Sequence, residues 1–128
     1  MTFSSRPRGN ALFLTALCTG AGVLHFVRPK PFDSLIPEQL PGSARAWTYG
    51  SGVAELATAA LIAVPKTRRL GGRVASLLFV GVFPGNVKMA WDWRNRSWQW
   101  QAVSIARLPL QADLIRRAES VRRGAPAV

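Results

Sequence analysis

The sequence contains little of the chemistry that soluble enzymes use. Its 128 residues include one cysteine, Cys18, and one histidine, His25. A single cysteine excludes an intramolecular disulfide, a CxxC redox pair and a cysteine-ligated metal cluster, so Cys18 is predicted to be a small packing residue. The chain also lacks an HxxxH zinc spacing, a GxSxG nucleophile elbow, a phosphate-binding glycine loop and a carboxylate pair placed for hydrolysis. These absences argue against a self-contained enzyme of a familiar class.

Acidic residues are scarce as well. Six Asp and Glu stand against 17 Lys and Arg, which gives a net charge of +11. An excess of this size is typical of nucleic-acid-binding proteins and of membrane proteins with basic collars. Here the basic residues form short blocks between long apolar stretches, so the predicted partner is a lipid bilayer and not a nucleic acid. The length predicts one domain, residues 1–128.

Four segments approach the roughly 20 residues that a helix needs to cross a bilayer. They cover about residues 11–27, 46–64, 74–91 and 98–115, and a basic tail follows over 116–128. The last segment is the least apolar, because it carries Arg107, Gln111 and Asp113, which need buried polar partners. Pro84 and Pro109 predict kinks. The sequence therefore predicts an all-α fold, an integral membrane four-helix bundle.

The connection over residues 28–45 contains four prolines and cannot form a long helix. It keeps an apolar edge, which predicts short helical or turn-like pieces lying in the headgroup plane: Phe32, Leu35, Ile36 and Leu40. Ten Lys and Arg flank the side of both termini and five flank the other side. This asymmetry predicts cytoplasmic termini and a multi-pass protein of the plasma (bacterial inner) membrane, with all five tryptophans in an outer aromatic belt.

Small residues four positions apart predict the contact faces between helices. They occur at Gly50, Ala54 and Thr58, and again at Gly81 and Gly85.

Polar groups at membrane depth cost several kcal/mol unless they are paired. Glu55 and Arg107 each lie about nine residues, hence about 13 Å, from the outer ends of their helices. Equal depth predicts an ion pair between them, with Gln111 one turn below Arg107. Two interpretations stay open: the pair only locks two helices together, or it belongs to a ligand or quinone pocket. The candidate ligand-binding residues are His25, Tyr49, Glu55, Asn86, Arg107 and Gln111.

Two other charged side chains have simpler interpretations. Lys88 is expected to extend to the outer headgroups. Asp113 stands four residues before Arg117, which predicts a surface ion pair.

An ordered set of short motifs resembles the DoxX-like family of small four-helix membrane proteins. The motifs are His25-Phe26 with Pro29, Ile36-Pro37, Glu55-Leu56, Val82-Phe83-Pro84 with Asn86, and Arg107-Leu108-Pro109-Leu110-Gln111. The resemblance covers about residues 22–114 and implies a four-helix membrane architecture. Some members of that family resemble quinone-linked subunits of thiosulfate oxidation, and others associate with redox proteins.

The resemblance implies an accessory subunit or partner of a membrane-associated redox complex, without activity of its own. One alternative is a quinone-reactive oxidoreductase subunit of the thiosulfate:quinone type, with quinone as cofactor. In it, Arg107 and His25 would hydrogen-bond the quinone oxygens and Glu55 would carry protons. Another alternative is a small transporter or assembly chaperone. The expected partners are the bilayer, redox-enzyme subunits or further copies of the chain.

Overall fold

All regular secondary structure in the described part of the chain is helical. The computed structural model describes residues 2–124, and side chains from residue 9 to residue 124. Within these residues there are five α-helices, a short 3-10 helix and no strand, which confirms the all-α prediction. The elements are α1 (Thr2–Val27), α2 (Pro29–Asp33), α3 (Ala44–Ala63), η1 (Pro65–Thr67), α4 (Arg68–Asp92) and α5 (Trp98–Arg123). The side chains of Arg6 and Arg8, and residues 125–128 of the predicted tail, lie outside this described part.

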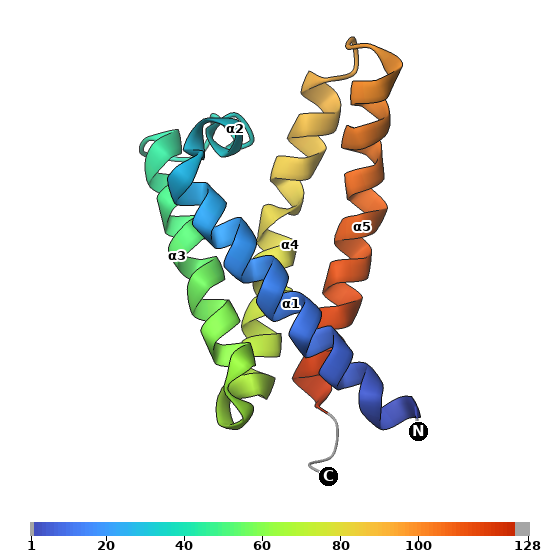
Figure 1. Ribbon diagram of the computed structural model, residues 1–128. Helices are drawn as coiled ribbons and strands as arrows, with labels where there is room; N and C mark the ends of the chain where they lie inside the picture. Colours follow the sequence, from blue (N-terminus) through green and yellow to red (C-terminus); the bar gives the residue numbers. More distant parts are fainter. Residues whose placement is uncertain (1, 125–128) are drawn as a thin grey trace.

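The four long helices run alternately up and down and form two pairs (Figure 1). Helix α1 packs on α3, and α4 packs on α5. The pairs meet through α3 against α4 and α1 against α5. Figure 1 shows that they lie close together at the end where α1 begins and α5 finishes, and that they diverge toward the end that carries α2. The bundle is therefore closed at one end and spread at the other.

The helix ends follow local signals. Ser43 caps α3 by accepting a hydrogen bond from the Ala46 amide at 3.1 Å. Helix α5 ends at Gly124, whose φ of 72° belongs to the left-handed region that glycine adopts without strain. Pro84 and Pro109 lie inside α4 and α5, so neither proline ends its helix.

Three predicted boundaries differ from the observed ones. Helix α5 extends through Arg123, so residues 116–123 of the predicted basic tail belong to the helix. Ala118 and Val121 are fully buried, and Glu119 accepts a hydrogen bond from Ser76 of α4 at 2.6 Å. These contacts hold the basic end of α5 in place. Helices α1 and α4 also begin earlier than the apolar segments, because a charged residue ends an apolar run without ending a helix.

The hydrophobic core lies at the closed end. Its buried members are mostly small, and Cys18 is among them, as predicted: Ala11, Leu14, Cys18, Ala59, Ile62, Ala75, Phe79, Ala118 and Val121. Small side chains allow the helix axes to approach closely there. Toward the spread end no comparable core is present among the described residues.

The small residues that make the closest helix contacts differ from the predicted ones. A β-carbon added at Gly50 or at Gly81 would meet no atom of another helix within 4 Å, so the prediction that these two glycines form contact faces was wrong. A β-carbon at Gly71 would collide with the Ile62 backbone, and one at Gly72 with the Arg122 backbone. These adjacent glycines bring α4 against α3 and α5 at the closed end.

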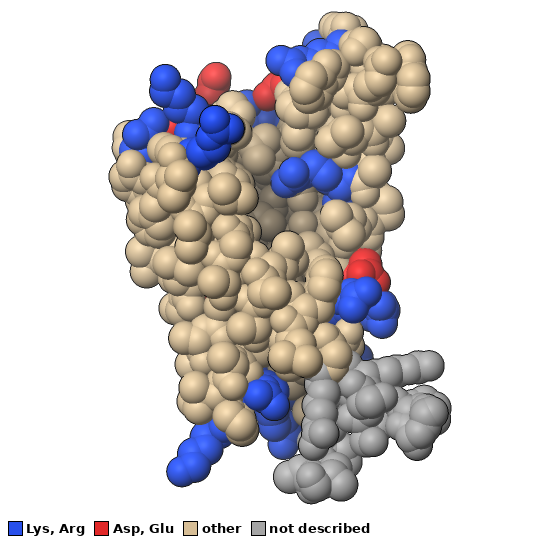
Figure 2. All heavy atoms as spheres, viewed as in Figure 1, with Lys and Arg blue, Asp and Glu red and all other residues tan. Residues whose placement is uncertain are grey.

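The outer surface is apolar along the helices. Figure 2 shows Lys and Arg gathered near the two ends on the side of α1 and α3, with an uncharged surface between them. Two helical stretches, Gly9–Val27 and Pro65–Asp92, are long and apolar enough to cross a membrane. Large apolar side chains such as Leu77 and Ile105 are 67% and 58% exposed on the helix flanks. The helical bundle is thus observed, and two of its helices have the length and composition that a membrane crossing needs.

Candidate ligand cavity

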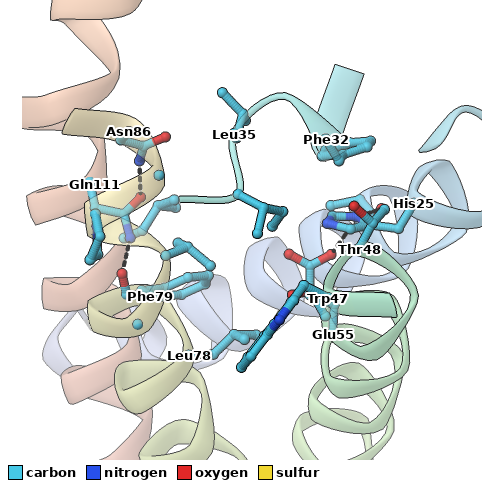
Figure 3. A pocket seen from close by; sticks show the side chains of 18 of the residues that line it. His25, Phe32, Leu35, Trp47, Thr48, Glu55, Leu78, Phe79, Asn86 and Gln111 are labelled. Carbon is cyan, nitrogen blue, oxygen red and sulfur yellow. Dashed lines mark hydrogen bonds and ion pairs between the residues drawn. The ribbon is translucent and has the colours of Figure 1, made fainter. Parts of the chain in front are cut away.

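The divergence of the two helix pairs leaves a cavity of about 620 Å³ between them. Figure 2 shows the corresponding hollow between the two halves of the molecule. Its walls are mainly aliphatic and aromatic, with a few polar side chains that point inward from opposite sides (Figure 3). This size and composition are typical of sites for small molecules. Five of the six candidate ligand-binding residues line it: His25, Glu55, Asn86, Arg107 and Gln111.

The first polar wall joins α1 to α3 through His25 and Glu55. Nδ1 of His25 lies 2.6 Å from the Ala21 carbonyl and 3.2 Å from Oε2 of Glu55. The shorter distance assigns the Nδ1 hydrogen to Ala21, because one ring nitrogen carries one hydrogen at most. Oε2 of Glu55 is consequently buried without a hydrogen-bond donor among the described residues. A buried carboxylate oxygen in this state is open to a donor from a ligand.

Gly52 explains why this wall is so tightly built. A β-carbon at Gly52 would lie 2.9 Å from the β-carbon of His25 and 2.7 Å from the Phe26 ring. The missing side chain lets α1 approach α3, so that His25 reaches Glu55 three residues further along α3. The close approach of the helices therefore sets the position of both polar groups.

The second polar wall is a chain of hydrogen bonds between α4 and α5. Nε and Nη2 of Arg107 both donate to Oδ1 of Asn86, at 3.2 and 3.1 Å. Nδ2 of Asn86 donates to Oε1 of Gln111 at 2.8 Å. Nε2 of Gln111 donates in turn to the Phe79 carbonyl. This network pairs the amides of Asn86 and Gln111, but it supplies no negative charge to Arg107.

The predicted ion pair between Glu55 and Arg107 is therefore wrong. Glu55 contacts His25, and Arg107 contacts Asn86, on opposite walls of the cavity. The two residues lie at similar depths along their helices. However, α3 and α5 belong to different helix pairs, which separate at this level (Figure 1).

The proline-rich connection lines the cavity at the spread end of the bundle. Phe32 stacks on the His25 ring with 3.8 Å between ring centroids. Phe32 also lines the cavity, as do Leu35, Ile36 and Leu40. The apolar edge of this segment thus faces the cavity, and its location in a headgroup plane stays a prediction. Figure 3 shows Phe32 above His25 and Leu35 above the centre of the cavity. We call residues 29–43 the cap.

Polar contacts hold the cap at both sides. Oδ1 of Asp33 accepts from Thr48 at 2.6 Å, and Oδ2 accepts from Arg45 at 2.9 Å. The hydrogen bond from Thr48, followed by that from Arg45, lowers the pKa of Asp33. On the other side, Nζ of Lys88 donates to the Ser34 carbonyl at 3.0 Å and pairs with Asp92 at 2.6 Å. Lys88 therefore connects the cap to α4. The prediction was instead that its side chain extends to the headgroups.

Tyr49 lies outside the cavity. Its ring stacks on Phe26 at 5.2 Å, beneath the Arg45 guanidinium, and is 38% exposed. The structure therefore does not place Tyr49 beside the other candidate ligand-binding residues. Asp113 pairs with Arg117 at 2.8 Å, which confirms the predicted surface pair, and also with Arg116.

Sequence reasoning missed several residues that line the cavity. Trp47 and Thr48 on α3 belong to this group, as do the inward-facing cap residues. The alternation of proline with apolar residues in the cap was the available signal, but it does not reveal the direction of the side chains. Among the described residues, no group of three or more His, Cys, Asp or Glu could hold a metal ion.

A family model described as "Domain of unknown function (DUF8561)" matches residues 14–122. The chain belongs to the DUF8561 family. The matched range includes the cap and all residues named above for the two polar walls of the DUF8561 cavity. No curated protein and no solved structure matches the chain.

The DUF8561 match corrects the resemblance to DoxX-like proteins, which was wrong. The motifs that suggested it combine prolines near helix ends with single polar residues in apolar helices. Such combinations arise in many small apolar helical chains, because all of them must satisfy backbone groups near prolines and must pair polar side chains inside apolar helices.

Proposed function

We propose that this DUF8561 protein is a small four-crossing membrane protein that binds a lipid-soluble molecule in the cavity between its two helix pairs. The cavity carries the proposal. It is about 620 Å³ in volume, it has apolar walls, and its few polar groups converge from two sides. Both its position between helices and its lining suit a ligand that is mostly apolar and has a polar head.

The exposed apolar flanks support a bilayer as the surroundings. Large apolar side chains are exposed along the helices, while most charged side chains lie near the ends of the bundle (Figure 2). Crossing by α3 and α5 as well as by α1 and α4 is part of the proposal. In α5 the polar residues Arg107 and Gln111 face the cavity instead of lipid, which lowers the cost of placing this helix in a membrane.

In this proposal the protein is an accessory one, which holds or presents a ligand and has no chemistry of its own. Its location is the plasma membrane, with both termini in the cytoplasm. The association with a redox complex loses its support together with the DoxX-like resemblance. A quinone is a second candidate ligand, because its carbonyl oxygens could accept hydrogen bonds from Arg107 and, when both nitrogens of the His25 ring carry hydrogen, from Nε2 of His25 on the opposite wall.

Membrane insertion is tested on the full chain. After cell disruption without detergent, the protein should sediment with membranes and resist extraction with alkaline carbonate. Topology is tested with a membrane-impermeant maleimide, since Cys18 is buried and should not react. Ser97→Cys should be labelled in intact spheroplasts, and Lys66→Cys only after permeabilisation. Protein in the supernatant, or labelling of both variants in intact spheroplasts, would contradict the four-crossing arrangement.

Ligand binding is tested with a variant that fills the cavity. Ser51 lines the cavity, and Val53, two residues further along α3, is 59% exposed. Ser51→Leu should reduce the binding of oleate, methyl oleate and decylubiquinone, counted by native mass spectrometry from neutral detergent micelles. Val53→Leu is the matched control and should bind as the wild type does. If the wild type retains none of the three probes, the cavity is not a site for lipid-soluble ligands.

A further inference from the structure

The ionisable groups that line the cavity lie on two opposite walls. Three of its lining residues ionise as acids or bases at ordinary pH: His25, Glu55 and Arg107. On the first wall, His25 and Glu55 lie 3.2 Å apart and face each other. On the other wall, Arg107 is not within ion-pair distance of Glu55 or of any other acidic side chain of the described residues.

The neighbours of Arg107 do not supply a counter-charge. Both of its hydrogen bonds end on the neutral oxygen of Asn86. None of the ion pairs in the described part of the chain includes Arg107. A guanidinium group has five N–H donors, and two of them, one on Nε and one on Nη2, are used by the described residues. An arginine at membrane depth normally has a counter-charge or faces a polar cavity.

We infer that the cavity takes an amphiphile with one acidic head, a carboxylate or a phosphate, and an acyl chain. This inference rests on the proposed function and names the class of its ligand. The acidic head pairs with Arg107, whose planar guanidinium suits two-pronged binding of either group. The acyl chain lies along the apolar walls, which include Leu17, Leu78 and Leu114. A neutral ligand would leave the charge of Arg107 uncompensated.

Asn86 and Gln111 have a positioning role in this site. Asn86 holds the guanidinium through two hydrogen bonds, and Gln111 holds Asn86 in the orientation that presents Oδ1 to Arg107. Since Gln111 is itself fixed by the Phe79 carbonyl, the arginine is held from α4 without being neutralised. This arrangement leaves it able to pair with an anion.

The test compares probes that differ only in charge. The full chain in neutral detergent is incubated at about pH 8 with oleate or with methyl oleate, and bound probe is counted by native mass spectrometry. The wild type should bind oleate about tenfold more tightly than the ester, or better. Lysophosphatidic acid, compared with a neutral monoacylglycerol, shows whether the preferred head is a phosphate or a carboxylate.

Variants assign the preference to Arg107. Arg107→Gln should lose the preference for oleate over its ester while still binding the ester, and Arg107→Lys should keep part of the preference. Arg116→Gln removes the same charge from an exposed position on the same helix and should behave as the wild type does. The ester-binding measurement shows whether each variant is folded with an intact cavity.

Four results would overturn the inference. Equal binding of oleate and ester by the wild type refutes the acidic head but leaves ligand binding in the cavity supported. If Arg107→Gln keeps the preference for oleate, the role of Arg107 is refuted, while the acidic head of the ligand remains supported. Tighter binding of decylubiquinone than of any acidic probe would favour a quinone instead. If no probe binds, the proposed function fails as well.

Discussion

Two donors of Arg107 meet at one acceptor atom of Asn86: Nε and Nη2 of the arginine both donate to Oδ1 of the amide, at 3.2 and 3.1 Å. The amide nitrogen of Asn86 is used as well, in a 2.8 Å bond to Gln111. These bonds connect α4 to two residues of α5, and they lie inside the bundle because Asn86 is only 5% exposed. The position of the cationic group in the cavity depends on this one side chain.

Replacing Asn86 by Ala should destabilise the bundle. The change removes three hydrogen bonds and leaves Arg107 and Gln111 without these partners. We expect a loss of about 1–3 kcal/mol, as is usual when buried polar groups lose their partners. The measurement is the thermal unfolding midpoint in detergent, followed by circular dichroism. Asn95→Ala in the exposed α4–α5 loop is the control, and an equal midpoint for both variants would argue against the network.

Two glycines of α4 should respond in opposite ways to the same substitution. A β-carbon at Gly72 would collide with the Arg122 backbone, so Gly72→Ala should force α4 and α5 apart and lower the unfolding midpoint. Gly81 has open space around it, so Gly81→Ala should be neutral or should stabilise the helix by up to about 1 kcal/mol. Thermal unfolding of both variants checks this, and a midpoint of Gly72→Ala at or above the wild-type value would contradict the packing.

Lys88 should control the mobility of the cap. Lys88→Met removes the bond to the Ser34 carbonyl and the pair with Asp92. Amide hydrogen exchange over residues 34–40 should then become severalfold faster, because one of the attachments of the cap is lost. The control is Lys30→Met, since Lys30 is an exposed cap residue without a side-chain hydrogen bond among the described residues. Unchanged exchange in Lys88→Met would show that the contacts of the cap with α1 and α3 hold it without Lys88.

Glu119 should make stability depend on pH. Hydrogen bonds from Arg122 and Ser76 lower the pKa of Glu119 to about 2. Because the pKa is lower in the folded state than in the unfolded one, the contribution is present above about pH 4.5 and is lost as pH falls toward about 2. Glu119→Gln should therefore reduce the unfolding midpoint at neutral pH and reduce it progressively less on acidification.

The matched control for this pH dependence is Glu38→Gln in the exposed cap. Its unfolding midpoint should follow that of the wild type at every pH. Asp33 also loses stabilising bonds on acidification, but it does so equally in the wild type and in Glu119→Gln. A difference between wild type and Glu119→Gln that stays constant from pH 6 to pH 3 would contradict the assignment.

The sequence predicted the helices and the interrupted connection well. Apolar runs, prolines and caps act locally, so α3 was placed within about two residues of its observed ends, Ala44 and Ala63. The rise of a helix also gives the depth of a side chain, which is why Glu55 and Arg107 were both expected near one level. The predicted end of α5 was too early. Its basic last turns look like a tail by composition, but burial against α4 stabilises them as helix.

The sequence by itself determined that a few polar groups lie inside apolar helices, because composition and helical rise are properties of each segment alone. Which of these groups meet was decided only by the tertiary structure. Gly52 brings His25 to Glu55, and Gly71 with Gly72 closes one end of the bundle while the other end spreads. Contacts between helices depend on rotation about their axes and on the spacing between them, and the pattern within one segment contains neither.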